Sequence, residues 1–180
     1  MSGADASVKL RILRAPMSET DDLLINAAAY AEAFAANELP RAPARGLAVV
    51  TCMDARMDIF GLLGLQPGDA HVIRNAGGVI SDDALRSLVI SQRTQGTEEI
   101  VLIHHTDCGM LQFSDEELAR ALEAETGARP EWPVHAFEDP DRSVRESIAR
   151  ILESPFIRSK HSVRGFVFDN RTGELREVGG

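Results

Sequence analysis

Apolar side chains recur along the chain with a helical period in some segments and in continuous runs in others. Residues 18–35 carry them at three- and four-residue spacing, which predicts an amphipathic helix that begins at Ser18 and ends before Pro40. Residues 47–51 are almost continuously apolar, as is typical of a parallel strand buried on both faces. Similar short runs predict further strands over residues 70–74, 99–104 and 163–169.

Helical patterns separate these strands, over residues 57–65, 81–95, 114–126 and 141–152. Ser81 and Asp141 stand where N-caps are needed, and Ser114 with Glu117 forms a capping box. A turn and a return strand are predicted over residues 170–178. The alternation predicts an α/β fold: a mainly parallel central β-sheet flanked by helices on both faces, with an antiparallel C-terminal edge hairpin.

The length of 180 residues suits one domain with a sizeable core. We predict a single catalytic domain over residues 18–180, preceded by an N-terminal arm over residues 1–17. The arm contains a short apolar and basic alternation over residues 8–13. That pattern is compatible with an arm that packs on a neighbour and with a frayed end, and the sequence does not choose between them.

The net charge of −9 argues against a nucleic-acid or anionic-membrane partner, because both favour clustered Lys and Arg. No apolar run approaches the ~20 residues needed to span a bilayer. The first residues lack the apolar core of a secretory signal, so we expect a cytoplasmic protein. In that compartment the two cysteines, Cys52 and Cys108, are expected to stay reduced and available as metal ligands.

Chemically reactive side chains follow the predicted strands at the points where those strands end. Cys52 follows the first strand, Asn75 the second, and His105 with Cys108 the third. In a parallel sheet, ligands collect outside the carboxyl ends of the strands. Zinc takes thiolate and imidazole ligands in tetrahedral geometry, and catalytic sites use three protein ligands and leave the fourth position open. Cys52, His105 and Cys108 therefore form a candidate mononuclear zinc site.

The two cysteines also have interpretations that involve no metal. Free cysteines are often buried as small hydrophobic residues, and a single His-x-x-Cys spacing is common by chance. A thioredoxin-like dithiol is weakly supported because no Cys-x-x-Cys is present. A phosphatase loop is also disfavoured, because Cys52 and Arg56 are closer in sequence than a phosphate-cradling loop requires.

Asp54 and Arg56 sharpen the zinc interpretation. A carboxylate that accepts a hydrogen bond from a water on zinc would orient that water, and it must be ionised to do so. A neighbouring guanidinium favours the ionised form and fixes the carboxylate rotamer. The alternative is a surface ion pair of little energetic weight. The position of the pair, two and four residues after Cys52, favours the catalytic role.

Three motifs together resemble the ordered signatures of the β-class carbonic anhydrases. They are Cys52-Met53-Asp54-Ala55-Arg56, Arg74-Asn75-Ala76-Gly77-Gly78 and His105-Thr106-Asp107-Cys108-Gly109. The compact form of the motifs is similar to a subgroup that includes carbonyl sulfide hydrolases. The resemblance implies one Zn²⁺ per subunit held by Cys52, His105 and Cys108, and a catalytic Asp54–Arg56 dyad. It also implies a homodimer or homotetramer.

The implied reaction is the reversible hydration of carbon dioxide to bicarbonate and a proton, in which hydroxide on zinc attacks the substrate. The alternatives are hydrolysis of carbonyl sulfide and an inactive zinc-binding homologue. Carbon dioxide lacks charge, so we expect an apolar pocket approached closely by glycine backbone. The candidate pocket residues are Ile73, Asn75, Ala76, Gly77, Gly78 and Val79.

Some positions depart from the family pattern or stay open. Met53 and Ala55 replace serines that are frequent in the family, and a glutamine that many members place in the pocket has no assignable counterpart. The resemblance also implies a switch in which Asp54 leaves Arg56 and takes the fourth zinc position. Outside the motifs, His104 is predicted to be structural, with support of a metal ligand as the alternative, and His71 is predicted in the core or at an interface. His135 and His161 are predicted at the surface, with proton shuttling as the alternative for either.

Overall fold

The computed structural model describes residues 18–34 and 38–179, which fall into two units divided between Glu38 and Leu39. The first unit contains α1 (Glu19–Ala33). Ser18 and Asp21 form a reciprocal capping box at its start, which explains why the predicted helix begins there. Every described side chain of α1 is exposed. The predicted arm over residues 1–17 lies outside the described residues, and the predicted domain boundary stays a prediction.

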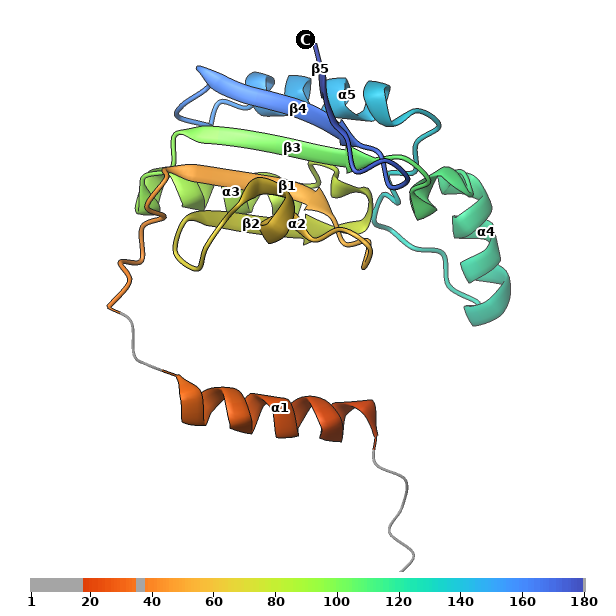
Figure 1. Cartoon of the computed structure of the whole chain (residues 1–180). Coiled ribbons are helices and arrows are strands. Elements are labelled where there is room, and N and C mark those ends of the chain that lie inside the picture. The colour runs from red at the N-terminus through yellow and green to blue at the C-terminus, as the bar shows by residue number, and fades with distance from the viewer. Residues whose placement is uncertain (1–17, 35–37, 180) are drawn as a thin grey trace, which may run out of the picture. The chain divides into compact units, whose positions relative to one another are not determined.

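The second unit is built on one five-stranded sheet with the order β2-β1-β3-β4-β5 (Figure 1). The strands are β1 (Leu47–Cys52), β2 (Ala70–Asn75), β3 (Glu99–His105), β4 (Ser162–Phe168) and β5 (Leu175–Val178). The first four pair in parallel, and β5 pairs with β4 in the antiparallel sense. The predicted fold class, with its C-terminal edge hairpin, is confirmed.

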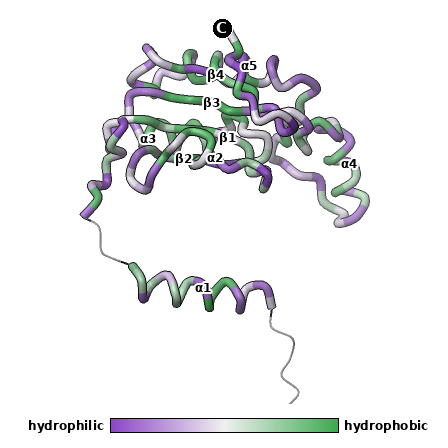
Figure 2. Tube along the Cα trace, in the orientation of Figure 1, coloured by the Kyte–Doolittle hydropathy of each residue, from purple (hydrophilic) through white to green (hydrophobic). Residues whose placement is uncertain are grey.

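Alternating side chains of the central strands feed two separate hydrophobic clusters. Val50 and Leu102 belong to the cluster that α3 (Asp82–Gln95) and α5 (Pro140–Glu153) cover. Val49 and Ile103 point the other way, into a cluster that includes residues of α2 (Ile59–Leu63). The apolar run of β1 appears in Figure 2 as a largely hydrophobic strand in the middle of the sheet. Burial on both faces accounts for the nearly continuous apolar sequence of this strand.

The remaining elements lie beyond the carboxyl ends of the strands. They are the short helices η1 (Ala76–Gly78) and η2 (Gly109–Leu111), and α4 (Asp115–Thr126). Ser114 and Glu117 form the predicted capping box of α4. The helix predicted over residues 57–65 is shorter than expected, because Asp58 caps its start and Gly64 is left-handed at its end.

Two glycines allow backbone to approach where a side chain would not fit. Gly78 has a φ of 70°, and a Cβ there would lie 2.8 Å from the backbone nitrogen of Cys52. The η1 turn is therefore pressed against the end of β1. A Cβ at Gly165 in β4 would lie 2.2 Å from the Cγ1 atom of Val144 in α5.

Within the described ranges, no helix combines the length and apolar character that crossing a bilayer requires.

Candidate metal centre

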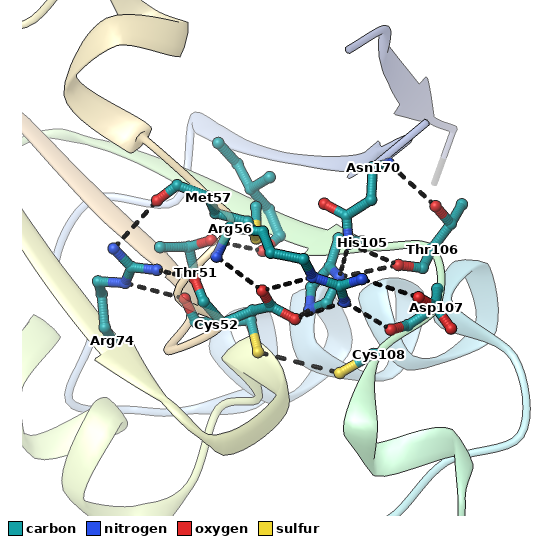
Figure 3. Close-up of polar contacts among 12 residues, drawn as sticks. Thr51, Cys52, Arg56, Met57, Arg74, His105, Thr106, Asp107, Cys108 and Asn170 are labelled. Carbon is teal, nitrogen blue, oxygen red and sulfur yellow. Dashed lines mark hydrogen bonds and ion pairs between the residues drawn. The ribbon is translucent and has the colours of Figure 1, made fainter. Parts of the chain in front are cut away.

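The candidate ligands converge because β1 and β3 are neighbours in register. Thr51 pairs with Ile103, and the Thr51 hydroxyl donates to the Ile103 carbonyl at 2.9 Å. Cys52 is the last residue of β1 and His105 the last residue of β3, so both side chains leave the same edge of the sheet. Cys108 follows three residues later, at the start of η2. Figure 3 shows the three side chains in one cluster.

The geometry of this cluster fits a zinc ion. The two sulfur atoms lie 3.9 Å apart, and all three candidate ligand atoms lie within 4.8 Å of one another. Two thiolates on a tetrahedral zinc at about 2.3 Å would be separated by about 3.8 Å. All three residues are buried. The Nε2 atom of His105 is buried without a hydrogen-bond partner among the described residues, as expected for a nitrogen reserved for a metal.

The His105 ring is oriented by contacts on its far side. Its Nδ1 atom lies 2.9 Å from the carbonyl oxygen of Thr106 and 2.8 Å from the amide nitrogen of Asn170. Asn170 also donates through Nδ2 to the Thr106 carbonyl at 2.9 Å, and its backbone N–H donates to the Thr106 hydroxyl at 3.1 Å. These contacts hold the ring with Nε2 toward the two cysteines. The Thr106 carbonyl can accept from a protonated Nδ1, which leaves the Nε2 lone pair for a metal, and Asn170 holds that carbonyl in place.

The two thiols share their ionisation unequally in the absence of a metal. A hydrogen bond from Cys108 lowers the pKa of Cys52 to about 4, against the opposing effect of burial. The same contact, together with burial, raises the pKa of Cys108. Burial disfavours charge on His105, but the neighbouring sulfur of Cys52 outweighs it, and the pKa of His105 is raised. One thiolate is therefore already favoured, as a metal ligand requires.

Asp54 and Arg56 form a bidentate pair beside the cluster. Arg56 donates through Nε to Asp54 Oδ1 at 2.9 Å and through Nη2 to Asp54 Oδ2 at 2.7 Å. The pair holds the pKa of the Asp54 carboxyl well below its usual range. Oδ2 lies 3.7 Å from the Nε2 atom of His105, so an ionised carboxylate oxygen faces the candidate metal position. The predicted adjacency of Asp54 and Arg56 is present in the structure.

The loop between Cys52 and Met57 is fixed from its other side by Arg74. Its guanidinium donates to the carbonyl oxygens of Cys52 at 2.9 Å, Asp54 at 2.6 Å and Met57 at 3.2 Å. Three carbonyls of one turn are thus satisfied by one side chain from β2, the neighbouring strand. Arg74 belongs to a predicted motif, but its contact with this loop was not predicted.

Comparisons with known proteins agree with this geometry. A family model described as carbonic anhydrase matches residues 47–133. β-Carbonic anhydrase 1 of Mycobacterium tuberculosis is 52% identical over 162 residues, which cover 90% of this chain and 99% of the relative. This chain belongs to the β-carbonic anhydrase family. Members of the family are zinc-dependent, and the buried Cys52, His105 and Cys108 cluster fits that requirement.

Two further relatives place the chain within the family. The crystal structure of carbonic anhydrase from Streptococcus mutans superposes with a TM-score of 0.85 at 41% identity, over 91% of this chain and 99% of that one. A carbon disulfide hydrolase of Acidianus sp. is 35% identical, over 74% of this chain and 77% of the relative. The relatives of this chain therefore include a protein named for a different substrate.

A cavity of about 470 Å³ opens beside both sulfur atoms and is lined mainly by apolar side chains. Of the candidate pocket residues, Ala76 and Gly77 line it, whereas Ile73 faces a hollow between β2 and α3, and Val79 faces one beside α5. Asn75 donates to the Val79 carbonyl instead, and Gly78 packs on β1. Apolar lining residues that the sequence did not identify are Met110, Phe113, Leu118, Trp132 and Val134.

The other histidines lie apart from the cluster. His104 is fully buried and contacts the Gly78 carbonyl through Nε2 at 3.0 Å, and burial lowers its pKa to about 4. This is the structural position predicted for it. His71 contacts the Ser91 hydroxyl at 2.7 Å, and His161 contacts that of Ser159 at 2.7 Å on the surface. His135 is half-buried, with a left-handed φ of 61°.

Asn170 is the residue that sequence reasoning missed at the cluster itself. A turn was predicted over its position, after the fourth strand, at the same edge of the sheet as Cys52 and His105. That placement was a usable signal, because side chains at this edge gather around one point. Asn170 was overlooked because it lies outside the three family motifs.

Proposed function

We propose that this chain catalyses the reversible hydration of carbon dioxide to bicarbonate and a proton. The observation that carries the proposal is the buried Cys52, His105 and Cys108 cluster beside the Asp54–Arg56 pair. One zinc ion per chain would be held by the two thiolates and the Nε2 atom of His105. When bound, zinc supplies a water molecule acidic enough to act as a nucleophile near neutral pH.

Asp54 and Arg56 would orient the nucleophile. The Asp54 carboxylate stays ionised because Arg56 donates two hydrogen bonds to it, so it can accept a hydrogen bond from the attacking water. Arg56 also prevents rotation of the carboxylate, which keeps Oδ2 on the side of the His105 ring nitrogen. The hydrogen-bond acceptor and its holder are thus supplied by two residues of one turn.

The apolar cavity would receive the substrate. Carbon dioxide offers neither charge nor a strong hydrogen-bonding group, so side chains such as Met110, Val134 and Trp132 suit it better than polar ones. The backbone of Gly77 borders the same cavity as the sulfur of Cys52. Substrate carbon and attacking water would therefore meet at the inner end of the cavity.

A stopped-flow hydration assay with a pH indicator tests this function on the zinc-loaded protein. Asp54→Asn should retain one zinc per chain and lose at least about 100-fold in kcat, because the charged acceptor that orients the attacking water is removed without a change in size. Cys108→Ser should lose zinc. Full zinc occupancy in Cys108→Ser would overturn the ligand assignment, and full activity in Asp54→Asn would overturn the role of the dyad.

A second candidate function is hydrolysis of a sulfur-containing heterocumulene, carbonyl sulfide or carbon disulfide. It is favoured by the 35% identity to the carbon disulfide hydrolase of Acidianus sp.. The metal cluster and dyad would serve either substrate, and discrimination would rest on the cavity. A sulfide-release assay beside the hydration assay separates the two functions. Activity in neither assay, with zinc bound, would identify an inactive homologue.

We also propose that Asp54 can close the site at lower pH by replacing water on the metal. The motive is the position of its carboxylate, 3.7 Å from the ligand nitrogen of His105. Hydration activity should then decrease as the pH is lowered. In crystals grown at acidic pH, the Asp54 carboxylate should lie closer to the metal than in crystals grown at alkaline pH. Water retained on zinc in crystals between about pH 6 and pH 9 would contradict this.

We propose that the working protein is a cytoplasmic homodimer or homotetramer. Support for assembly comes from large apolar side chains left exposed in the second unit, among them Met53 and Trp132 beside the cavity. Support for the location comes from the two free thiols, which an oxidising compartment would not preserve. Sedimentation velocity tests the assembly. A single species with the 19.6 kDa mass of one chain would overturn it.

A further inference from the structure

Arg56 is shared between two carboxylates, not one. Besides its two hydrogen bonds to Asp54, it donates through Nη1 to Asp107 Oδ2 at 2.8 Å and through Nη2 to the Asp107 carbonyl at 2.9 Å. A guanidinium has five N–H donors in a rigid plane. Four of them are therefore committed, two to each aspartate. Figure 3 shows the Asp107 side of this arrangement, and the plane of the group is fixed from both sides.

The backbone of Asp107 is held in an unusual conformation that makes this contact possible. Its φ is 55°, in the left-handed region that residues other than glycine rarely adopt, although Asp tolerates it better than most. In that conformation both the carboxylate and the carbonyl of Asp107 meet Arg56. The residue lies between His105 and Cys108, so Arg56 joins the turn after β1 to the loop after β3.

One carboxylate alone would hold Arg56 loosely. The Asp54 side chain is 15% exposed, but that of Arg56 is 51% exposed, so part of this long side chain lies in water and other rotamers stay accessible. The Asp107 side chain is itself 61% exposed, but Asp107 adds two acceptors from a different segment, one of them a backbone carbonyl, and together they restrict that freedom. Restricting Arg56 also restricts Asp54, because the position of the Asp54 carboxylate depends on where the guanidinium lies.

We propose that Asp107 is a positioning residue for the reaction: it fixes Arg56, and through Arg56 it keeps the Asp54 carboxylate beside the metal position. This inference rests on the proposed function. Asp107 itself touches neither cavity nor ligand atoms among the contacts of the described residues. Removal of the Asp107 carboxylate should therefore lower kcat and leave KM nearly unchanged, because the uncharged substrate makes no binding contact with Asp107.

Three substitutions in the zinc-loaded protein test the proposal. Asp107→Gly removes the carboxylate and relieves the left-handed backbone, Asp107→Ala removes the carboxylate and keeps the strain, and Asp107→Asn keeps an acceptor oxygen. We expect Gly and Ala to lower kcat for hydration by about tenfold with KM within about twofold, and Asn to stay within about threefold of the parent. Parental kcat in Asp107→Gly would overturn the proposal.

A double-mutant cycle separates positioning from a structural role. Once Arg56→Gln has removed the guanidinium, adding Asp107→Gly should lower kcat no further, because Asp107 acts through Arg56. Additive losses in the double variant would show that Asp107 acts by another route. If activity and melting temperature fell together, and both fell further in Asp107→Ala than in Asp107→Gly, Asp107 would have only a structural role.

A spectroscopic readout keeps the test independent of activity. The Arg56 Nε–H signal, assigned by its absence in Arg56→Lys, should exchange with solvent at least about tenfold faster in Asp107→Gly than in the parent. Unchanged exchange would overturn the proposal even if activity fell. A parent that binds zinc but hydrates no carbon dioxide would instead refute the proposed function, and the exchange rate would still decide whether Asp107 fixes Arg56.

Discussion

The backbone of Gly78 lies so close to the end of β1 that no side chain fits between them. A Cβ at this position would lie 2.8 Å from the nitrogen of Cys52 and 2.9 Å from the carbonyl carbon of Thr51. Because both neighbours are backbone atoms, they cannot move aside as a flexible side chain would. The position of a candidate metal ligand therefore depends on the absence of a methyl group on an adjacent turn.

We predict that Gly78→Ala destabilises the protein by more than the strain of a left-handed alanine, about 1–2 kcal/mol, and lowers its zinc content. Gly127→Ala is the matched control, since Gly127 has a similar φ of 76° but open space at the Cβ position. Urea unfolding and metal analysis measure both effects. Equal destabilisation of the two variants would show that close approach to β1 does not matter.

Asn170 offers a second test at a single residue. Asn170→Ala removes the contacts that orient His105, and we expect zinc affinity to fall by about 10- to 100-fold. Arg171→Ala, in the same turn, is the control and should leave the affinity unchanged. Competition with a chromogenic chelator gives the dissociation constants. An Asn170→Ala protein with parental affinity would assign the His105 orientation to Thr106 alone.

The ease of predicting each site residue follows from how far its partners lie along the chain. Cys52, Asp54 and Arg56 share one turn, and their chemistry can be interpreted from local spacing. Asn170 reaches His105 across 65 residues, through the pairing of β3 with β4. Asp107 contacts Arg56 across 51 residues. Such contacts depend on strand order and register, which local spacing does not specify.

Packing between α5 and β4 depends on a small residue in the strand. A Cβ at Gly165 would lie 2.2 Å from Val144 Cγ1 and 2.9 Å from Ile148 Cδ1. Val144 is fully buried, so it has little room to move. The helix can lie close to the sheet only because β4 presents no side chain at this point, and no regular apolar pattern would have indicated that.

We predict that Gly165→Ala lowers the free energy of unfolding by about 1–3 kcal/mol through overpacking. Val144→Ala should lower the free energy of unfolding by less in the Gly165→Ala background than in the parent. The smaller side chain at position 144 leaves room for the methyl group added at position 165. Gly179→Ala is the control, with nothing near its Cβ position. Denaturant unfolding of the four proteins gives the coupling. Strict additivity would contradict a direct contact between these side chains.

Element types were predictable because each has its own apolar period. The four parallel strands and the helices between them follow from runs and three- or four-residue spacing. Boundaries were less predictable. The helix expected over residues 57–65 shrinks to Ile59–Leu63, because the caps at Asp58 and Gly64 outweigh the wider apolar pattern.

The whole second unit has two cores, one on each face of the sheet, and only one of them includes the candidate ligands. Cys52 and Cys108 pack with Met57, Ile59 and Met110, whereas the helices α3 and α5 belong to the opposite cluster. Loss of the metal should therefore loosen one face before the other. The two faces share the strands but not their side chains.

We predict that chelation lowers the melting temperature, since a ligand that binds the folded state stabilises it. Amide hydrogen exchange should accelerate over Gly109–Leu111 and residues 53–57, while α3 and α5 keep their protection. Mass spectrometry of peptide fragments resolves the two sets. Equal acceleration on both faces would show that the metal supports the sheet as a whole.

The separation of the candidate ligands along the chain also has a consequence for biosynthesis. Cys52 is made 56 residues before Cys108, an interval of roughly 3 to 11 s at ribosomal speeds of about 5–20 residues per second. Asn170 emerges later still, 65 residues after His105. A nascent chain therefore carries a lone cysteine of the site for several seconds before the complete set of candidate ligands exists. The three candidate ligands are complete only once Cys108 has been made, and Asn170, which holds His105 in place, follows later.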